Sequence, residues 1–119
     1  MPLRNEKQIH DTNVVKVVTA QTGDALYFSR AAIPHQRDAG ASTQYLRHIG
    51  VYAYRADWLQ KMAKLSATPL EDAERLEQLR ALENGAKIRV VLVDDVVSIA
   101  IDTPQDLEAA EEFLQKIKG

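Results

Sequence analysis

Two short runs of β-branched and aromatic residues stand close together near the start of the chain, at 14–19 (VVKVVT) and 25–28 (ALYF). The residues between them, AQTGD, bring the glycine and polar side chains of a β-hairpin connection. Strands joined so closely pair antiparallel, which argues against a purely parallel sheet. Residues 1–13 are polar and aperiodic, so we expect a lead-in followed by one domain over 14–119.

Two later segments, Thr68-Pro69-Leu70-Glu71 and Thr103-Pro104-Gln105-Asp106, carry the same helix-start signature. Threonine supplies the N-cap, proline suits the first helical position, and the acid follows three residues after the cap. The first helix should run to Gly85, which can take the left-handed conformation of a helix end. An earlier helix is expected over 56–65. The last helix carries a narrow apolar seam that could face the core or another subunit: Leu107, Ala110, Leu114 and Ile117.

Three further strands are predicted from the apolar pattern. Residues 45–54 alternate, the run at 88–93 is apolar enough for burial on both faces, and 96–101 is a second short run. The fold class is therefore α/β with an α+β character, a mixed sheet with a hairpin and about three helices.

Composition excludes several classes of function. The formal net charge of -2, without a cluster of basic residues, leaves no footprint for nucleic-acid binding. The chain has no cysteine, which excludes disulfides and thiolate zinc sites. No apolar run approaches the length of a membrane span, and the first residues lack a signal-peptide core, so we expect no membrane partner and a cytoplasmic location.

Two places along the predicted strands stand out as candidate binding positions. Arg30 ends an apolar strand, where its guanidinium could fork onto a carboxylate or phosphate, or simply pair with an acid on the surface. His48 and Tyr52 alternate onto one face of the 45–54 strand, about 13 Å apart by strand rise. Gly50 between them would leave room for a small polar ligand, or would only mark a bulge.

Two more candidates involve helices. Glu77 and Gln78 lie at the edge of an apolar helical stripe, where they could hydrogen-bond sugar hydroxyls; alternatively Glu77 pairs with Arg80 on a solvated face. Asp102 precedes the last helix, where its carboxylate could hold Mg²⁺ or could itself be the N-cap.

Taken in order, the segments VVKVVT, ALYFSRAAIP, LRHIGVYAYR, TPLEDAERLEQLRALENGAKIRV and IDTPQDLE resemble the second half of CMP-Kdo synthetases (3-deoxy-manno-octulosonate cytidylyltransferases). The resemblance covers about residues 13–113. It implies the carboxyl-terminal half of a nucleotide-diphospho-sugar transferase fold. It also implies transfer of a cytidylyl group from CTP to Kdo, with release of pyrophosphate, for lipopolysaccharide biosynthesis in the bacterial cytoplasm.

The resemblance also assigns roles to the candidate residues. Asp102 would be a ligand of Mg²⁺, the expected cofactor, and no catalytic side chain is identified. Family enzymes are homodimers, so a homodimer is expected. The residues that would bind Kdo are Arg30, His48, Tyr52, Glu77 and Gln78.

This chain departs from the family pattern in three respects, one of which is a short loop between Ile33 and Tyr45. It lacks the family's CTP-binding half, so we expect it to be inactive alone, to need a separate nucleotide-binding half, and to self-associate through uncovered apolar surface. Ala100 stands where the family usually has glycine. Two alternatives stay open: a non-catalytic dimerisation or sugar-acid-binding module, or half of a cytidylyltransferase for another acidic sugar, such as a sialic acid.

Overall fold

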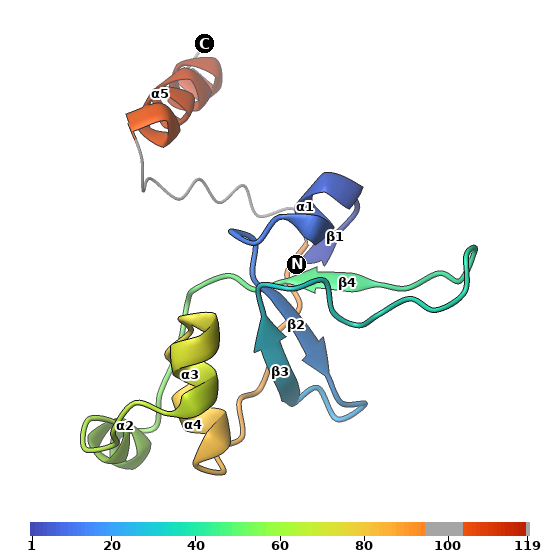
Figure 1. Ribbon diagram of the computed structural model, residues 1–119. Helices are drawn as coiled ribbons and strands as arrows, with labels where there is room; N and C mark the ends of the chain where they lie inside the picture. Colours follow the sequence, from blue (N-terminus) through green and yellow to red (C-terminus); the bar gives the residue numbers. More distant parts are fainter. Residues whose placement is uncertain (95–103, 119) are drawn as a thin grey trace.

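The computed structural model describes residues 1–94 and 104–118, in which a four-stranded sheet is combined with helices (Figure 1). The strand order is β1-β4-β2-β3, and each neighbouring pair is antiparallel. The strands are β1 (Pro2–Leu3), β2 (Lys16–Thr19), β3 (Ala25–Ser29) and β4 (Tyr45–Arg47). The described helices are α1 (Glu6–His10), α2 (Ala56–Met62), α3 (Pro69–Glu74), α4 (Gln78–Glu83) and α5 (Pro104–Lys118). The predicted α/β class is confirmed.

The predicted hairpin is formed by β2 and β3, in which Val17 lies opposite Phe28. Gly23 occupies the turn with a φ of 87°, which glycine adopts without the strain of a Cβ atom. The Ala20 N–H donates to the Asp24 carbonyl at 2.9 Å and closes the turn. Local turn chemistry therefore accounts for this part of the fold.

The core lies between this hairpin and α4. Phe28 is 1% exposed and Leu79 of α4 is fully buried, and they pack in one cluster with Val17, Leu46 and Leu76. Figure 1 shows α3 and α4 beside the β2–β3 hairpin, in agreement with the contact between α4 and β3. Burial of each large apolar side chain contributes roughly 1.5–3 kcal/mol, so this cluster sets the position of α4 on the sheet.

The first residues are ordered, which differs from the expected lead-in. In β1, Leu3 is buried and pairs with Tyr45 of β4. The amino group of Met1 donates to the Arg47 carbonyl at 3.1 Å, and the Asn5 side chain caps α1. A strand of two residues is too short to show a hydrophobic periodicity. Its partner strand also lies more than 40 residues away along the chain, so no local sequence signal predicts the pairing.

The single helix expected from Thr68 to Gly85 is divided into α3 and α4. Its predicted ends are confirmed: Thr68 is the N-cap of α3, and Gly85, after α4, has a φ of 81°. The division falls at Arg75, which is left-handed with a φ of 55°. The carbonyls of Glu74 and Arg75 accept hydrogen bonds from the Arg30 side chain, so tertiary donors replace the next helical turn.

Two predicted strands are shorter or more exposed than expected. The strand predicted over 45–54 ends at Arg47, and residues 48–54 form no regular ladder. At 88–93, pairing is limited to a bridge between Asp24 and Arg89, and Val91 is 75% exposed, so burial of this segment on both faces is wrong. The predicted strand at 96–101 lies outside the described residues.

Candidate functional site

A cavity of about 1030 Å³ lies where the sheet, α4, the start of α2 and two irregular segments, 47–55 and 85–93, meet. Its wall combines polar side chains with an apolar and aromatic lining. His48, Tyr52 and Gln78, three of the candidate residues, line it. Cavities of this size with a few convergent polar groups are the usual form of a small-molecule site.

His48 and Tyr52 are in direct contact. The Tyr52 hydroxyl lies 2.6 Å from Nε2 of His48, and the His48 ring stands edge-on to Phe28 at 5.2 Å between centroids. Tyr54 stacks on Tyr52 at 5.9 Å. The two side chains therefore do not flank an open gap, as expected from a regular strand, but meet at their tips. The strand geometry on which that expectation depended is absent, because β4 ends at Arg47 and residues 48–54 are irregular.

Both of these polar rings are neutral at pH 7. Burial, and then the positive charge of the Met1 amino group, lower the pKa of the His48 imidazole below its ordinary value. Burial, and then the neighbouring Tyr54, raise the pKa of the Tyr52 phenol. The pair therefore offers hydrogen bonds to a ligand and no charge of its own.

Gln78 and Glu77 are separated by the start of α4. Gln78 is half-buried on the cavity wall, and its Nε2 is buried without a hydrogen-bond partner among the described residues. An unpaired buried donor of this kind favours a ligand acceptor. Glu77 is exposed and is not among the described residues that line the cavity.

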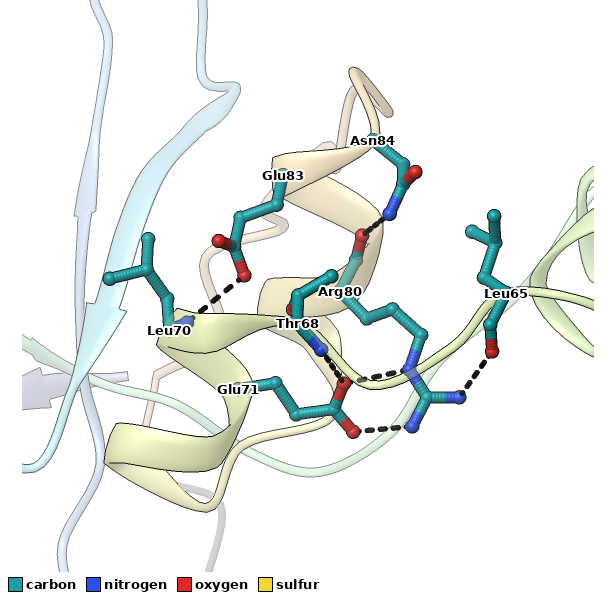
Figure 2. Close-up of polar contacts among 7 residues, drawn as sticks. All are labelled: Leu65, Thr68, Leu70, Glu71, Arg80, Glu83 and Asn84. Carbon is teal, nitrogen blue, oxygen red and sulfur yellow. Dashed lines mark hydrogen bonds and ion pairs between the residues drawn. The ribbon is translucent and has the colours of Figure 1, made fainter.

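The position of α4 depends on an ion pair that sequence analysis missed (Figure 2). Arg80 donates through Nε to Glu71 at 2.7 Å and through a terminal nitrogen to the same carboxylate. The Thr68 N–H also donates to Glu71, and Arg80 reaches the Leu65 carbonyl. The hydrogen bond from Arg80 lowers the pKa of the Glu71 carboxyl. The alternative of a Glu77–Arg80 pair is wrong, because Arg80 forks onto Glu71 instead.

Arg30 lies at the end of β3, outside the described cavity lining. Its guanidinium donates to the carbonyls of Glu74 at 2.7 Å, Thr12 at 3.1 Å and Arg75 at 3.4 Å. The Glu74 carboxylate accepts from the Arg30 N–H and from the Ser29 hydroxyl. Burial alone would raise the pKa of the Glu74 carboxyl, but these hydrogen bonds lower it below its ordinary value. The guanidinium of Arg30 therefore binds three backbone carbonyls, called the carbonyl cage below, rather than an acid side chain on the surface.

Basic side chains outnumber acidic ones around the cavity. Arg55 pairs with Asp57 at 3.6 Å, and Arg89 pairs with Asp24 at 3.0 Å. The remaining two, Arg47 and Lys87, have no ion-pair partner within the described part of the chain. This balance favours an anionic ligand.

Asp102, the candidate Mg²⁺ ligand, lies outside the described residues. Within residues 1–94 and 104–118, no group of three or more imidazole or carboxylate side chains is arranged to hold a metal ion. Over the same residues, no helix is long and apolar enough to cross a bilayer.

The antiparallel sheet, the helices packed against it and a cavity lined by both apolar and polar side chains define an α/β protein with a cavity of small-molecule size. A family model described as cytidylyltransferase matches residues 1–88, and the chain belongs to this family.

The resemblance to 3-deoxy-manno-octulosonate cytidylyltransferases is confirmed. The chain is 53% identical to the enzyme of that name from Solibacter usitatus over 113 residues, which is 95% of this chain and 44% of the relative. It is 52% identical to the one from Syntrophotalea carbinolica over 122 residues, 96% of this chain and 48% of the relative. The chain thus spans about half the length of the curated relatives it matches.

A solved structure has the same fold. It is described as CMP:2-keto-3-deoxy-manno-octonic acid synthetase complexed with CTP, and it superposes with a TM-score of 0.89 at 38% identity. The match covers 97% of this chain and 46% of that one.

Proposed function

We propose that this chain provides the sugar-acid-binding part of a cytidylyltransferase that transfers the cytidylyl group of CTP to Kdo. One observation carries the proposal: the side chains of His48, Tyr52 and Gln78 line the same cavity, together with the basic side chains of Arg47 and Lys87. The relatives and the CTP-bound neighbour, named for this reaction, support the same substrate pair.

The residues of this chain would act by positioning. The neutral His48–Tyr52 pair and the free Gln78 amide would hydrogen-bond the sugar hydroxyls. The basic rim would attract the anion, and Arg30 would bind its carboxylate directly. Holding the nucleophilic hydroxyl in line with the α-phosphate is the main contribution a protein makes to transfer at phosphorus. Arg30 and Glu77 are further proposed sugar-acid contacts. The resemblance implies that the reaction takes place in the cytoplasm.

Mg²⁺ is proposed as the cofactor, with Asp102 as one ligand. When bound, the ion would neutralise charge developing on the phosphate. The described residues contain no group of three or more potential metal ligands, so Asp102 would need further ligands from outside them. Asp102→Asn should weaken Mg²⁺ binding to the chain in the presence of CTP, measured by titration calorimetry; unchanged binding would remove Asp102 from this role.

Binding of the sugar acid can be measured by titration calorimetry on this chain with Kdo. A hydrogen bond to a ligand contributes roughly 0.5–1.5 kcal/mol, so Tyr52→Phe should weaken binding about threefold to tenfold. Tyr45→Phe is the matched control, because Tyr45 lies in β4 away from the cavity lining. Equal affinity of the two variants, or tighter binding of a sialic acid than of Kdo, would contradict the proposal.

Transfer itself is proposed to need a nucleotide-binding half like that of the family. We expect the chain with CTP, Kdo and Mg²⁺ to release no pyrophosphate. Full turnover under these conditions would show that the 119 residues suffice.

A further inference from the structure

The Arg30 side chain donates hydrogen bonds to three backbone carbonyls. Its Nε donates to the Glu74 carbonyl at 2.7 Å, and its terminal nitrogens donate to the carbonyls of Thr12 and Arg75. A guanidinium has five N–H donors in a planar fork. These contacts therefore leave about two donors for a ligand, on a group whose orientation is already set.

Lys16 fixes the main chain around this arginine. It is fully buried in β2, and its ammonium group donates to three carbonyls, those of Arg30 at 2.6 Å, Val14 at 2.5 Å and Asp11 at 2.8 Å. An ammonium has three donors, so all are used within the protein. Lys16 thereby ties the Arg30 backbone to the 11–14 loop, which carries the Thr12 carbonyl that holds the guanidinium.

Glu74 also holds Arg30. Its carboxylate accepts from the Arg30 N–H at 3.0 Å and from the buried Ser29 hydroxyl at 2.6 Å, while its carbonyl accepts from Arg30 Nε. One residue of α3 therefore fixes both the backbone and the side chain of Arg30.

We infer that Lys16 and Glu74 are positioning residues, which hold the Arg30 guanidinium so that its uncommitted donors meet the carboxylate of the sugar acid. This inference rests on the proposed function. Neither side chain needs to touch the ligand, because Lys16 has no donor left and Glu74 carries the same charge as the carboxylate.

The first test observes Arg30 directly, without ligand. The ¹⁵N–¹H signal of Arg30 Nε, assigned by its loss in Arg30→Lys, should be protected from solvent exchange because it donates to Glu74. Lys16→Met keeps the side-chain length and removes the ammonium, and Glu74→Gln keeps the shape and removes the charge. In each variant the exchange rate should rise about tenfold or more, as expected when a charged hydrogen bond of this kind is loosened. Lys64→Met makes the same chemical change at an exposed lysine and should leave the signal unchanged.

The second test compares Kdo with its methyl ester, because only the acid can use Arg30 as a carboxylate anchor. The ratio of the two affinities should fall about tenfold in Lys16→Met and in Glu74→Gln, and should stay the same in Lys64→Met. A loss of folding alone would lower both affinities together and leave the ratio unaltered, which would overturn the inference.

The two failures can be told apart. An unaltered Arg30 signal in both variants overturns the positioning roles, whatever the chain binds. If the Arg30 signal changes in both variants but the wild-type chain binds the acid and the ester equally, Lys16 and Glu74 hold Arg30 without any role in acid recognition. That result overturns both the inference and the sugar-acid proposal.

Discussion

At the scale of single residues, the buried polar side chains of the described chain are Lys16, Ser29 and Glu71. Each has a partner on another element or loop: the Arg30 carbonyl for Lys16, Glu74 for Ser29, and Arg80 for Glu71. Removing one partner of such a contact leaves a buried polar group uncompensated. Substitutions at these contacts should therefore destabilise more than substitutions of exposed charges.

Arg80→Met is expected to lower the melting temperature at pH 7 clearly more than Arg37→Met, which removes an exposed arginine. The folded-state pKa of Glu71 is lowered from 4.5, mainly by Arg80, so the pair stabilises the fold above that pH and loses this contribution as the pH falls through the folded pKa. The gap between wild type and Arg80→Met should therefore narrow in acid. Thermal unfolding at pH 7 and pH 3 checks both points; equal melting temperatures for the two variants at pH 7 would contradict the role of the pair.

His48 should give the protein a pH-dependent stability in a separate range. Its folded-state pKa is lowered from 6.5, because burial and the Met1 amino group oppose its charge. The unfolded chain therefore binds more protons than the folded one below about pH 6.5, and the free energy of unfolding should fall as the pH drops through this value. Urea unfolding between pH 7.5 and 5.5 measures the slope. His48→Gln should flatten it, and the same slope in both proteins would contradict the assignment.

At the scale of elements, local signals set where helices begin and end, and tertiary contacts set where they break. Thr68 and Pro69 start α3, and Gly85 follows the end of α4 as expected. The interruption at Arg75 has no local signal in the sequence, since neither glycine nor proline lies nearby. It follows from the hydrogen bonds of Arg30, which compete for the carbonyls of α3.

Gly85→Ala should destabilise the protein by about 1 kcal/mol, because an L-residue is strained in the left-handed conformation. The φ of Gly85 is 81°, and no nearby group would clash with an added methyl, so the effect should come from the backbone alone. Gly50→Ala is the matched control, because Gly50 has equally open surroundings without a left-handed φ. Urea unfolding measures both; a loss at Gly50 equal to that at Gly85 would contradict this explanation.

At the scale of the whole molecule, the core is compact but apolar surface remains uncovered. Val51 is 83% exposed and Val91 is 75% exposed, and Leu107 and Leu114 of α5 are also exposed. Exposed large apolar side chains that share one helix, as Leu107 and Leu114 share α5, are candidates for an association surface. We therefore propose a homodimer in which α5 contributes to the contact.

Sedimentation velocity over the micromolar range should show the proportion of dimer rising with concentration. Leu107→Gln together with Leu114→Gln should raise the dissociation constant of the dimer by about a hundredfold or more, because burial of each leucine contributes roughly 1.5–3 kcal/mol. Leu92→Gln changes an exposed leucine outside α5 and is the matched control. A monomer at all concentrations would contradict the homodimer, and dissociation by Leu92→Gln alone would move the contact away from α5.

The sequence by itself determined the features whose physics is local. The hairpin follows from β-branched runs around a glycine turn, and the helix boundaries follow from capping residues and Gly85. His48, Tyr52 and Gln78 could be singled out as polar residues in apolar surroundings. Lys16 also has a local signal, because it is the one charged residue in the run VVKVVT.

Only the tertiary structure decided the rest, because it depends on contacts between residues far apart in the chain. The His48–Tyr52 contact requires the chain to leave β4 after Arg47, and the order of the first residues requires β4 as a partner. The split between α3 and α4, and the cage around Arg30, require donors brought from β3. Such contacts leave no periodic pattern in either segment, because each residue finds its partner only when the other segment is folded against it.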